Sequence, residues 1–588
     1  MSSQLSVMAV VCDKFEAQRA FKLLAAEKNF TIIALSISAE SYISQKFPSW
    51  QNPLYDLVGR EKYKSPRYTF ENFKDSYNFC DDTYFKYARD RLGYFLAELE
   101  RSLDLAREAI HKFKPQFLII GALKNYPGSS VVDGTLKTNA FFLVAKEGGI
   151  PYCLIGSNEK SFSFKQSVGK KVQLLRYLNK QSIQNECDLL ILATPRHLIQ
   201  MESTINEIKR RGINLTILTY NVTLALKGEL DKNFSVYLEK ERLIDSRIRK
   251  DVGKTQKRLR QDEPWSKFAT NKYRYNSVVL DYIKWKIQDI AKNETSEIFT
   301  DIELAQKVLL QLRPKALLTT TDPDSRILPY IDKARESGIK TICLQHGAFY
   351  GKDSPAIYPV SDFFIVWSEI SKNWLKRSDY FKHLKILVGN SPFHHYVKIP
   401  KKISSHKQLT ILYLATKQPT VDKGLVLYYL KTLFETLSKV DINFKLNVRV
   451  HPYQDKTNLG YLMENFTHEV GFANDCSLDE AIAKSDLVIY ENTTAGFDAM
   501  LQGKPTIYFN PYTGEDFYNV GAYGASLLIL NERDLSERLP EFIRAKKEWQ
   551  KMAIDGQKFA EKYLGLENSK GKNELVSALL NVLQMKNA

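Results

Sequence analysis

The stretch "SDLVIYENTTAGFDAMLQGKPTIYF", residues 485–509, contains two short apolar runs separated by a helical pattern. The run at 486–490 is typical of a buried strand, and Gly503 closes a segment, 497–502, whose pattern is that of a helix. A further strand begins after Pro505. The stretch therefore predicts a strand–helix–strand unit of a parallel sheet.

The same alternation continues along the chain in three series, which predicts an α/β fold with helices covering parallel sheets. The series lie within residues 1–180, 181–400 and 401–588, and the first carries a long helical insertion between its second and third strands. A polar, basic stretch at 396–408 is predicted to link the last two series. The predicted strands are VMAVVC, FTIIALSI, QFLIIGAL and PYCLIG, then DLLILAT, NLTILTY, ALLTTT, KTICLQ, DFFIVWS and LKILVGN, and finally LTILYLA, KLNVRV, DLVIYE and PTIYFN.

Composition limits the classes of partner. The chain has 588 residues, 44% of them apolar, and no apolar run approaches the ~20 residues of a membrane span. Its start lacks a basic region followed by a long apolar one, so we expect a cytoplasmic protein. The 84 basic and 67 acidic side chains give a net charge of +17, which favours an anionic membrane surface, a nucleic acid or a phosphate-bearing substrate. Aromatic-interleaved basic motifs are missing, which argues against nucleic acid.

Ligands of open α/β sheets bind beyond the carboxyl ends of the strands. Four predicted strand exits carry polar or reactive side chains: 319–326, 343–350, 448–455 and 488–505. In the last of these, Thr493 and Thr494 lie at or just before a helix N-terminus, which favours an anion. One threonine alone could be the helix cap, but the pair, with Gly496 allowing close approach, favours phosphate binding.

A second anion-binding side chain follows the strand of "KLNVRVHPYQD" (445–455). His451 at its exit could donate a ring N–H to the same phosphate or to a sugar hydroxyl, with Pro452 fixing the turn. Arg449, two residues earlier on the same strand face, could add positive charge. The alternative for His451 is a bond to a backbone carbonyl in the turn. We include Glu491, at the turn before the threonines, in this predicted site.

These motifs resemble a known group of enzymes. "RVHP" followed by "SDLVIYENTTAGFDAMLQGKPTIYF" is similar to the carboxyl-terminal half of GT-B fold glycosyltransferases, and most similar to bacterial capsule and surface-polysaccharide transferases. The segments "CLQHGAFY", "FIVWSEISKNWLK" and "LVGNSPFHHY" resemble others of that group. The resemblance covers roughly 310–530. It implies a GT-B-like fold, with two Rossmann-like domains facing a crevice.

The resemblance also implies domain roles. Residues 181–400 would form the acceptor-side domain and 401–588 the domain that binds the donor nucleotide. Residues 1–180 lie outside the resemblance, and their own α/β pattern is compatible with an extra Rossmann-like domain or with part of the acceptor-side domain. Lys417, after the first strand of the last series, could neutralise the leaving phosphate, or could simply face solvent.

Catalysis by such an enzyme requires a base for the acceptor hydroxyl, or groups that stabilise an oxocarbenium-like state. The candidates are Asp322 and Asp324, which follow one strand of the middle series, and His346, which follows the next. Gly347 would permit a close backbone approach beside His346. The aspartates flank Pro323 and could instead form a turn. Although "DPD" resembles the D-x-D of metal-dependent transferases, that motif belongs to a different fold, so no metal is predicted.

The predicted function is transfer of a sugar from a nucleotide-sugar to a glycan or lipid-linked acceptor, in capsule or lipopolysaccharide synthesis. The small set of cationic groups around the donor suits one phosphate, so we expect a CMP-linked acidic sugar rather than a UDP-sugar, and no other cofactor. The protein would act on the inner face of the membrane. Alternatives are a CDP-glycerol-type glycerophosphotransferase, a nucleotide-sugar 2-epimerase, or a non-enzymatic binder of anionic polymers.

Overall fold

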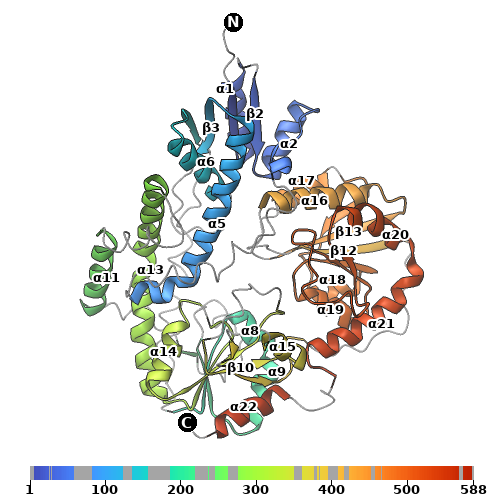
Figure 1. Cartoon of the computed structure of the whole chain (residues 1–588). Coiled ribbons are helices and arrows are strands. Elements are labelled where there is room, and N and C mark those ends of the chain that lie inside the picture. Colours follow the sequence, from blue (N-terminus) through green and yellow to red (C-terminus); the bar gives the residue numbers. More distant parts are fainter. Residues whose placement is uncertain are drawn as a thin grey trace.

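In the computed structural model the chain forms three parallel sheets, each covered by helices (Figure 1). Pairing is parallel between all neighbouring strands that the structure describes, so the predicted α/β class is confirmed. The described residues are 6–57 without 26 and 28, 83–122, 135–156, 186–218, 236–237, 246–261, 276–349 without 323, 360–394 without 377–380 and 383, 408–415, 423–451, 457–567 without 465, and 574–585.

The N-terminal unit has a four-stranded sheet of order β2-β1-β3-β4. Helices α1 and α2 pack on one face, and the long insertion predicted between the second and third strands is α5, which packs with α6 on the other. This sheet is separate from the middle one. The bounds are β1 Val7–Val11, α1 Lys14–Leu24, β2 Phe30–Ala34, α2 Ile37–Lys46, α3 Leu54–Leu57, α5 Thr83–Phe113, β3 Phe117–Ala122, α6 Thr135–Glu147 and β4 Tyr152–Gly156.

The middle sheet has seven strands in the order β11-β10-β9-β8-β5-β6-β7. Its first strand β5 lies next to its fourth strand β8, which is the arrangement of a Rossmann fold. Helices α13 and α14 cover one face, and α9 covers the other. The bounds are β5 Leu189–Leu192, α8 Pro195–Gln200, α9 Glu202–Arg210, β6 Leu215–Leu218, β7 Val236–Tyr237, α11 Ser246–Leu259, α13 Ser277–Leu312, β8 Ala316–Thr319, α14 Leu328–Glu336, β9 Lys340–Leu344, β10 Phe363–Val366, α15 Glu369–Leu375 and β11 Lys385–Val388.

The C-terminal sheet has the order β14-β13-β12-β15-β16-β17, again that of a Rossmann fold. Strand β13 buries alternate residues as its sequence predicts, with Val448 and Val450 in the core and Arg449 half-buried. The bounds are β12 Leu409–Ala415, α16 Lys423–Ser438, β13 Phe444–Val450, α17 Thr457–Glu464, β14 Glu469–Phe472, α18 Leu478–Ala483, β15 Leu487–Tyr490, α19 Ala495–Leu501, β16 Thr506–Phe509, β17 Leu527–Ile529, α20 Leu539–Arg544, α21 Lys546–Tyr563 and α22 Glu574–Gln584.

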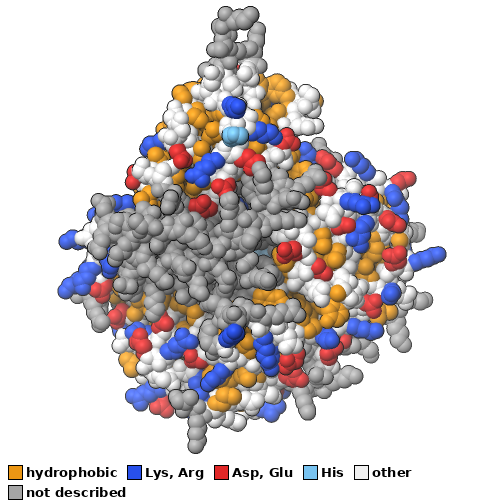
Figure 2. Space-filling model, in the orientation of Figure 1, with side chains coloured by type: hydrophobic (Ala, Val, Ile, Leu, Met, Phe, Trp, Pro, Cys, Tyr) orange, Lys and Arg blue, Asp and Glu red, His pale blue; other side chains and the backbone are white. Residues whose placement is uncertain are grey.

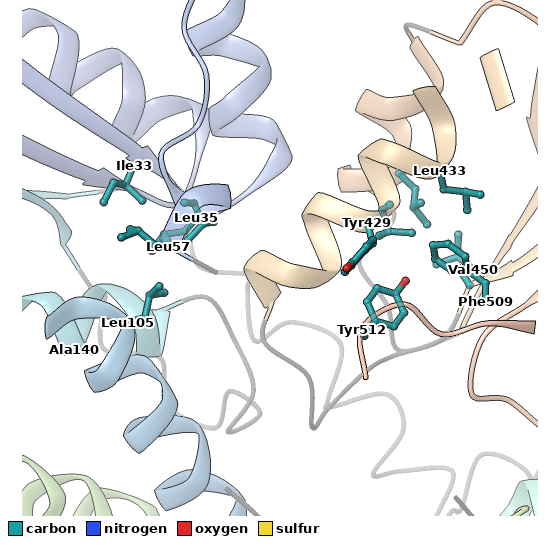
Figure 3. Packing of buried hydrophobic residues seen from close by; sticks show 14 of the residues in the cluster. Ile33, Leu35, Leu57, Leu105, Ala140, Tyr429, Leu433, Val450, Phe509 and Tyr512 are labelled. Carbon is teal, nitrogen blue, oxygen red and sulfur yellow. The ribbon is translucent and has the colours of Figure 1, made fainter. Parts of the chain in front are cut away.

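The N-terminal unit contacts both other sheets through their helices. Helix α5 packs against α13 of the middle domain, while α2 and α3 lie against α17 and α16 of the C-terminal domain (Figure 1). At the second contact Lys431 Nζ lies 2.8 Å from the buried Glu40 carboxylate, and the ring of Tyr55 packs on that of Tyr428. Figure 3 shows Tyr429 of α16 packed in the core beside Tyr512, with Leu57 of the N-terminal unit across the junction.

Helix α22 does not belong with the sheet that precedes it. Its apolar residues Leu575, Val576 and Leu579 pack in the core of the middle domain, against α9 and β11. The range 401–588 predicted for the C-terminal domain is therefore too long at its end, because the chain returns to the middle domain. The confirmed architecture is α/β and GT-B-like, with two Rossmann-like domains and an additional N-terminal α/β region. In the part of the chain that the structure describes, no helix combines the length and apolar character needed to cross a bilayer.

Candidate active site

The two Rossmann-like sheets define where ligands are expected. In an open α/β sheet the site lies beyond the carboxyl ends of the strands, at the point where the strand order reverses. This point lies between β5 and β8 in the middle sheet, and between β12 and β15 in the C-terminal sheet. The candidate site is formed by the residues that follow these four strands, together with those that follow β9, β11 and β13.

In the middle sheet the reversal point is bridged by a histidine and a threonine. His197 lies in the first turn of α8, which begins at Pro195 after the side chain of Thr194 caps it. Its Nδ1 lies 2.8 Å from the hydroxyl Oγ1 of Thr320, the residue after β8. The ring also lies 5.2 Å, centroid to centroid, from that of His346, which follows β9. Three strand exits thus meet at one polar cluster.

Both histidines of this cluster are held neutral. Burial lowers the pKa of His197 to about 3, with smaller contributions from the nearby His346 and Arg196. Burial also lowers the pKa of His346 to about 4, although a hydrogen bond to the backbone of Thr320 acts in the opposite direction. A neutral imidazole has one nitrogen that can accept a proton. At neutral pH each ring therefore keeps one unprotonated nitrogen, which can accept a hydrogen bond.

The surroundings of His346 explain the sequence "QHG". The side chain of Gln345 accepts the Trp367 backbone N–H at 2.9 Å and donates to the Gly347 carbonyl at 3.0 Å, so it fixes the loop that carries His346. Trp367 in turn donates its indole N–H to the Gln345 carbonyl. Apart from its chain neighbours, no described residue has an atom within 4 Å of a Cβ placed on Gly347. Among the described residues, therefore, no backbone makes the close approach predicted at Gly347.

The two aspartates predicted as catalytic have local partners. Asp322 is fully buried and accepts hydrogen bonds from the backbone N–H groups of Val360 and Ser361, at 2.9 and 2.8 Å, and from the Thr319 hydroxyl. This arrangement fastens a distant loop to the end of β8, which is a structural role. Asp324 accepts from the guanidinium of Arg326 at 2.6 and 2.9 Å, as in the predicted turn. Of the predicted trio, Asp322 and Asp324 are thus engaged by neighbouring protein groups, while His346 lies in the polar cluster with His197.

In the C-terminal sheet, the predicted threonine pair follows β15 at the reversal point. Thr493 Oγ1 accepts the Ala495 N–H at 3.3 Å, and Thr494 occupies the cap position of α19 without a side-chain capping bond. Both side chains are half-buried. Glycine is needed at position 496 for a different reason from the one predicted, since a Cβ there would lie 2.2 Å from the ring of Tyr490. The close approach at Gly496 is made by a core tyrosine and not by a ligand.

The predicted donor residues differ in how the surrounding protein engages them. His451 follows β13 at the same edge, half-buried. Arg449 instead donates to the Ala473 and Cys476 carbonyls at 2.6 and 2.8 Å, so its guanidinium is used to fix the loop before α18. Glu491 is buried and accepts the hydroxyls of two core tyrosines at 2.5 and 2.7 Å, Tyr413 and Tyr512. Lys417 lies outside the described residues.

The two sheets are connected at this site by a further pair. His394, after β11 of the middle sheet, lies with its Nε2 3.7 Å from the Asp498 carboxylate on α19 of the C-terminal sheet. The other ring nitrogen of His394 lies 2.7 Å from the Ser391 hydroxyl. Burial and the Asp479 carboxylate raise the pKa of Asp498 to about 8, and Arg196 of α8 opposes this shift. The helix that follows the threonine pair is thus held against the middle domain.

Sequence reasoning missed three residues of this site: His197, His394 and Asp498. A weak signal was available for the first, since "TPRH" follows a predicted strand with a cap and a proline that aim the next side chains. Within the described residues, His, Cys, Asp and Glu side chains form no group of three or more that could hold a metal ion.

Comparisons with known proteins complete the description. The chain resembles the crystal structures of MurG from Acinetobacter baumannii (12% identity over 63% of this chain and 95% of that one, TM-score 0.37) and of UDP-GlcNAc 2-epimerase from Neisseria meningitidis bound to UDP-GlcNAc (14%, 67% and 99%, 0.41). It also resembles a glycosyltransferase from Rickettsia africae (13%, 68% and 98%, 0.42). With TM-scores this low, these likenesses bear on neither substrate nor mechanism. Proteins of curated function give no match.

The family comparison is more informative. Residues 163–517, which are more than half of the chain, match the LIC12162 family of transferases. This range contains the middle sheet and most of the C-terminal one, and it includes His197, His346, His394, Thr494 and Asp498. The predicted enzyme class, a transferase, is thereby confirmed, and the chain belongs to the LIC12162 transferase family.

Proposed function

We propose that the chain is a glycosyltransferase that moves a sugar from a nucleotide-sugar to a hydroxyl group of a growing cell-surface glycan. The observation that carries this proposal is the neutral pair His197 and His346, joined through Thr320 at the reversal point of the middle sheet. The threonine pair and His451 occupy the corresponding edge of the C-terminal sheet. Family membership supports group transfer rather than 2-epimerisation.

His346 is the proposed base. One of its nitrogens is used in a hydrogen bond to the backbone of Thr320, which leaves the other to accept the proton of the acceptor hydroxyl. The hydroxyl oxygen then bonds to the anomeric carbon while the bond from that carbon to the phosphate oxygen breaks, and the nucleotide leaves. The low pKa of His346 in the free enzyme would rise when a negatively charged donor binds beside it. His197 would orient the ring from the adjacent strand exit.

The proposed donor is a CMP-linked acidic sugar. His451, Thr493 and Thr494 supply a hydrogen-bonding histidine and two hydroxyls, and Arg449 is engaged by two carbonyls, so the described residues of this edge offer little fixed positive charge. A monophosphate leaving group develops less negative charge than a diphosphate, for which enzymes often use a divalent ion or several cationic side chains. We therefore also propose that transfer proceeds without a metal.

Nucleotide competition tests the donor class. Isothermal titration with CMP, CDP, UDP and GDP should give the tightest binding for CMP, and CMP should inhibit release of nucleotide from a CMP-linked acidic sugar. Turnover should persist in EDTA. Preferential binding of UDP, or loss of turnover on chelation, would contradict the CMP assignment while leaving sugar transfer in place. Turnover of a CDP-glycerol donor in preference to any sugar donor would contradict sugar transfer itself.

A further inference from the structure

The helix pair α11 and α13 forms a basic outer surface that the proposed chemistry does not use. Helix α11 buries Ile248, Thr255 and Leu259, whose spacing of seven and four residues places them on one face. Its exposed face carries basic side chains along about 20 Å of helix. These are Arg249, Lys250, Lys254, Lys257 and Arg258, with Arg260 directly after the helix. We call this set, together with Trp285, the α11 surface.

Within the described helix α11, Asp251 is the acidic side chain; it is half-buried and lies 3.5 Å from Lys254. The remaining basic groups of this helix give a positive field. Figure 1 places α11 at the outer edge of the molecule, and basic side chains project from that edge in Figure 2.

An exposed tryptophan lies at the end of this surface. Trp285 of α13 is 46% exposed, with the Lys286 ammonium 5.8 Å from its ring centre. Gln288, one turn further along α13, donates to the Leu259 carbonyl at the end of α11 at 2.7 Å. This contact places Trp285 near the basic groups at the C-terminal end of α11. Tryptophan favours the boundary between water and the apolar part of a bilayer.

We propose that the α11 surface binds the anionic leaflet of a membrane, with Trp285 inserted at the headgroup level. The basic groups lie along the outside of one helix, a shape that suits a flat charged surface. A single-stranded nucleic acid is instead bound in a groove with several stacking aromatics. This inference does not depend on the proposed sugar transfer, since it predicts binding to lipid alone.

Vesicle sedimentation tests the proposal with matched variants. The full chain should bind vesicles of phosphatidylcholine and phosphatidylglycerol, should not bind phosphatidylcholine alone, and should be released as salt rises. The variant K254Q/K257Q/R258Q should partition roughly 100-fold more weakly, since each basic group near an anionic leaflet changes binding about fivefold. Trp285→Ala should remove the binding that remains at high salt.

The control variant removes the same charge elsewhere. Lys547, Lys551 and Lys558 are exposed on α21, a helix on the far side of the molecule from α11 in Figure 1, and K547Q/K551Q/K558Q should bind vesicles like the unaltered chain. An equal loss of vesicle binding in both triple variants would mean that net charge alone causes the binding, and would overturn the assignment. Unchanged binding of the α11 variant would do the same. Tighter binding of an RNA oligonucleotide than of anionic vesicles at matched salt would identify nucleic acid as the partner instead.

Discussion

The imidazole of His394 and the carboxylate of Asp498 lie 3.7 Å apart although they belong to different domains. His394 follows the last strand of the middle sheet, and Asp498 lies on the helix that begins beside Thr494. The ring of His394 also packs edge-on against Trp367, whose loop is fixed by Gln345 next to His346. The contact thus connects the loop of the proposed base to the helix of the proposed donor site.

The raised pKa of Asp498 predicts a pH-dependent effect of Asp498→Asn. Between the ordinary carboxyl pKa and about 8, the folded protein keeps a proton that the unfolded chain loses, so stability falls as pH rises through this window. Asparagine resembles the protonated acid and cannot ionise. The stability advantage of the variant should grow as pH rises from about 4 to about 8, and should reach at least about 1 kcal/mol near about pH 9. Thermal unfolding at several pH values measures this.

The groups facing Asp498 decide how this result is interpreted. They are His394 from the middle domain, Asp479 from α18 and Arg196 from α8. If the variant is instead less stable than the unaltered protein at neutral pH, Asp498 is ionised and paired with a protonated His394. Glu548→Gln, at an exposed position of α21, is the control and should show no trend with pH.

Removing the proposed base should affect turnover and leave donor binding intact. We expect His346→Ala to lower kcat by about 10²- to 10⁴-fold, the usual contribution of a general base, with unchanged affinity for CMP. Thr320→Val keeps the buried shape but removes the hydroxyl that contacts His197. It should lower kcat by about fivefold, as loss of one neutral hydrogen bond does, and should alter the pH profile of kcat. Full activity of His346→Ala would contradict the assignment of the base.

Substitution by alanine should affect stability at one of two glycines near the site and not at the other. Gly496→Ala would place a Cβ 2.2 Å from the Tyr490 ring, so we expect a loss of about 1–3 kcal/mol in unfolding free energy. Apart from its chain neighbours, the Cβ of Gly347→Ala meets no atom of a described residue within 4 Å, so the substitution should leave thermal stability unchanged. If the acceptor approaches His346 from the side of Gly347, the same substitution should raise KM for the acceptor. Normal kinetics of Gly347→Ala would place the acceptor elsewhere.

Arg449 and His451 provide a matched pair on one strand exit. Arg449→Met removes the side chain that donates hydrogen bonds to two loop carbonyls, so the free energy of unfolding should fall by about 1–3 kcal/mol. The folded fraction of the variant should bind CMP as tightly as the unaltered protein. His451→Ala should do the reverse, with little change in Tm and about tenfold weaker CMP binding. Calorimetry of both variants separates the two roles. Retained CMP affinity in His451→Ala would remove this histidine from the donor site.

Local patterns predicted the strands well because buried parallel strands are short, apolar and β-branched. Each predicted strand is present, from Val7–Val11 to Thr506–Phe509. Three strands at or near sheet edges were missed: the two-residue β7, the half-exposed β14 with its glycine, and the three-residue β17. Strands β7 and β17 are too short, and β14 is too mixed in composition, to show a period that distinguishes them from loops.

The roles of site residues were harder to predict because they depend on partners distant in sequence. The carboxylate of Asp322 is bound by backbone groups 38 and 39 residues away, and Glu491 by a tyrosine 78 residues away. His197 becomes part of the site only because β5 lies beside β8. The order of strands in a sheet cannot be predicted from the local pattern of apolar residues. The presence of a polar residue at a strand exit was therefore predictable. Whether distant parts of the chain form hydrogen bonds with its side chain was not.

The return of α22 to the middle sheet means that the chain passes twice between the two Rossmann-like domains, and both passages lie together. The Ser391 N–H donates to the Leu564 carbonyl at 2.9 Å, and the Leu575 N–H donates to the Asn390 side chain at 2.9 Å. Gly389 fits here because a Cβ would lie 3.0 Å from Leu575 Cα. The Ser391–Leu564 bond ties the exit of the middle domain to the end of α21, so a movement that separated the two domains at this point would have to break it.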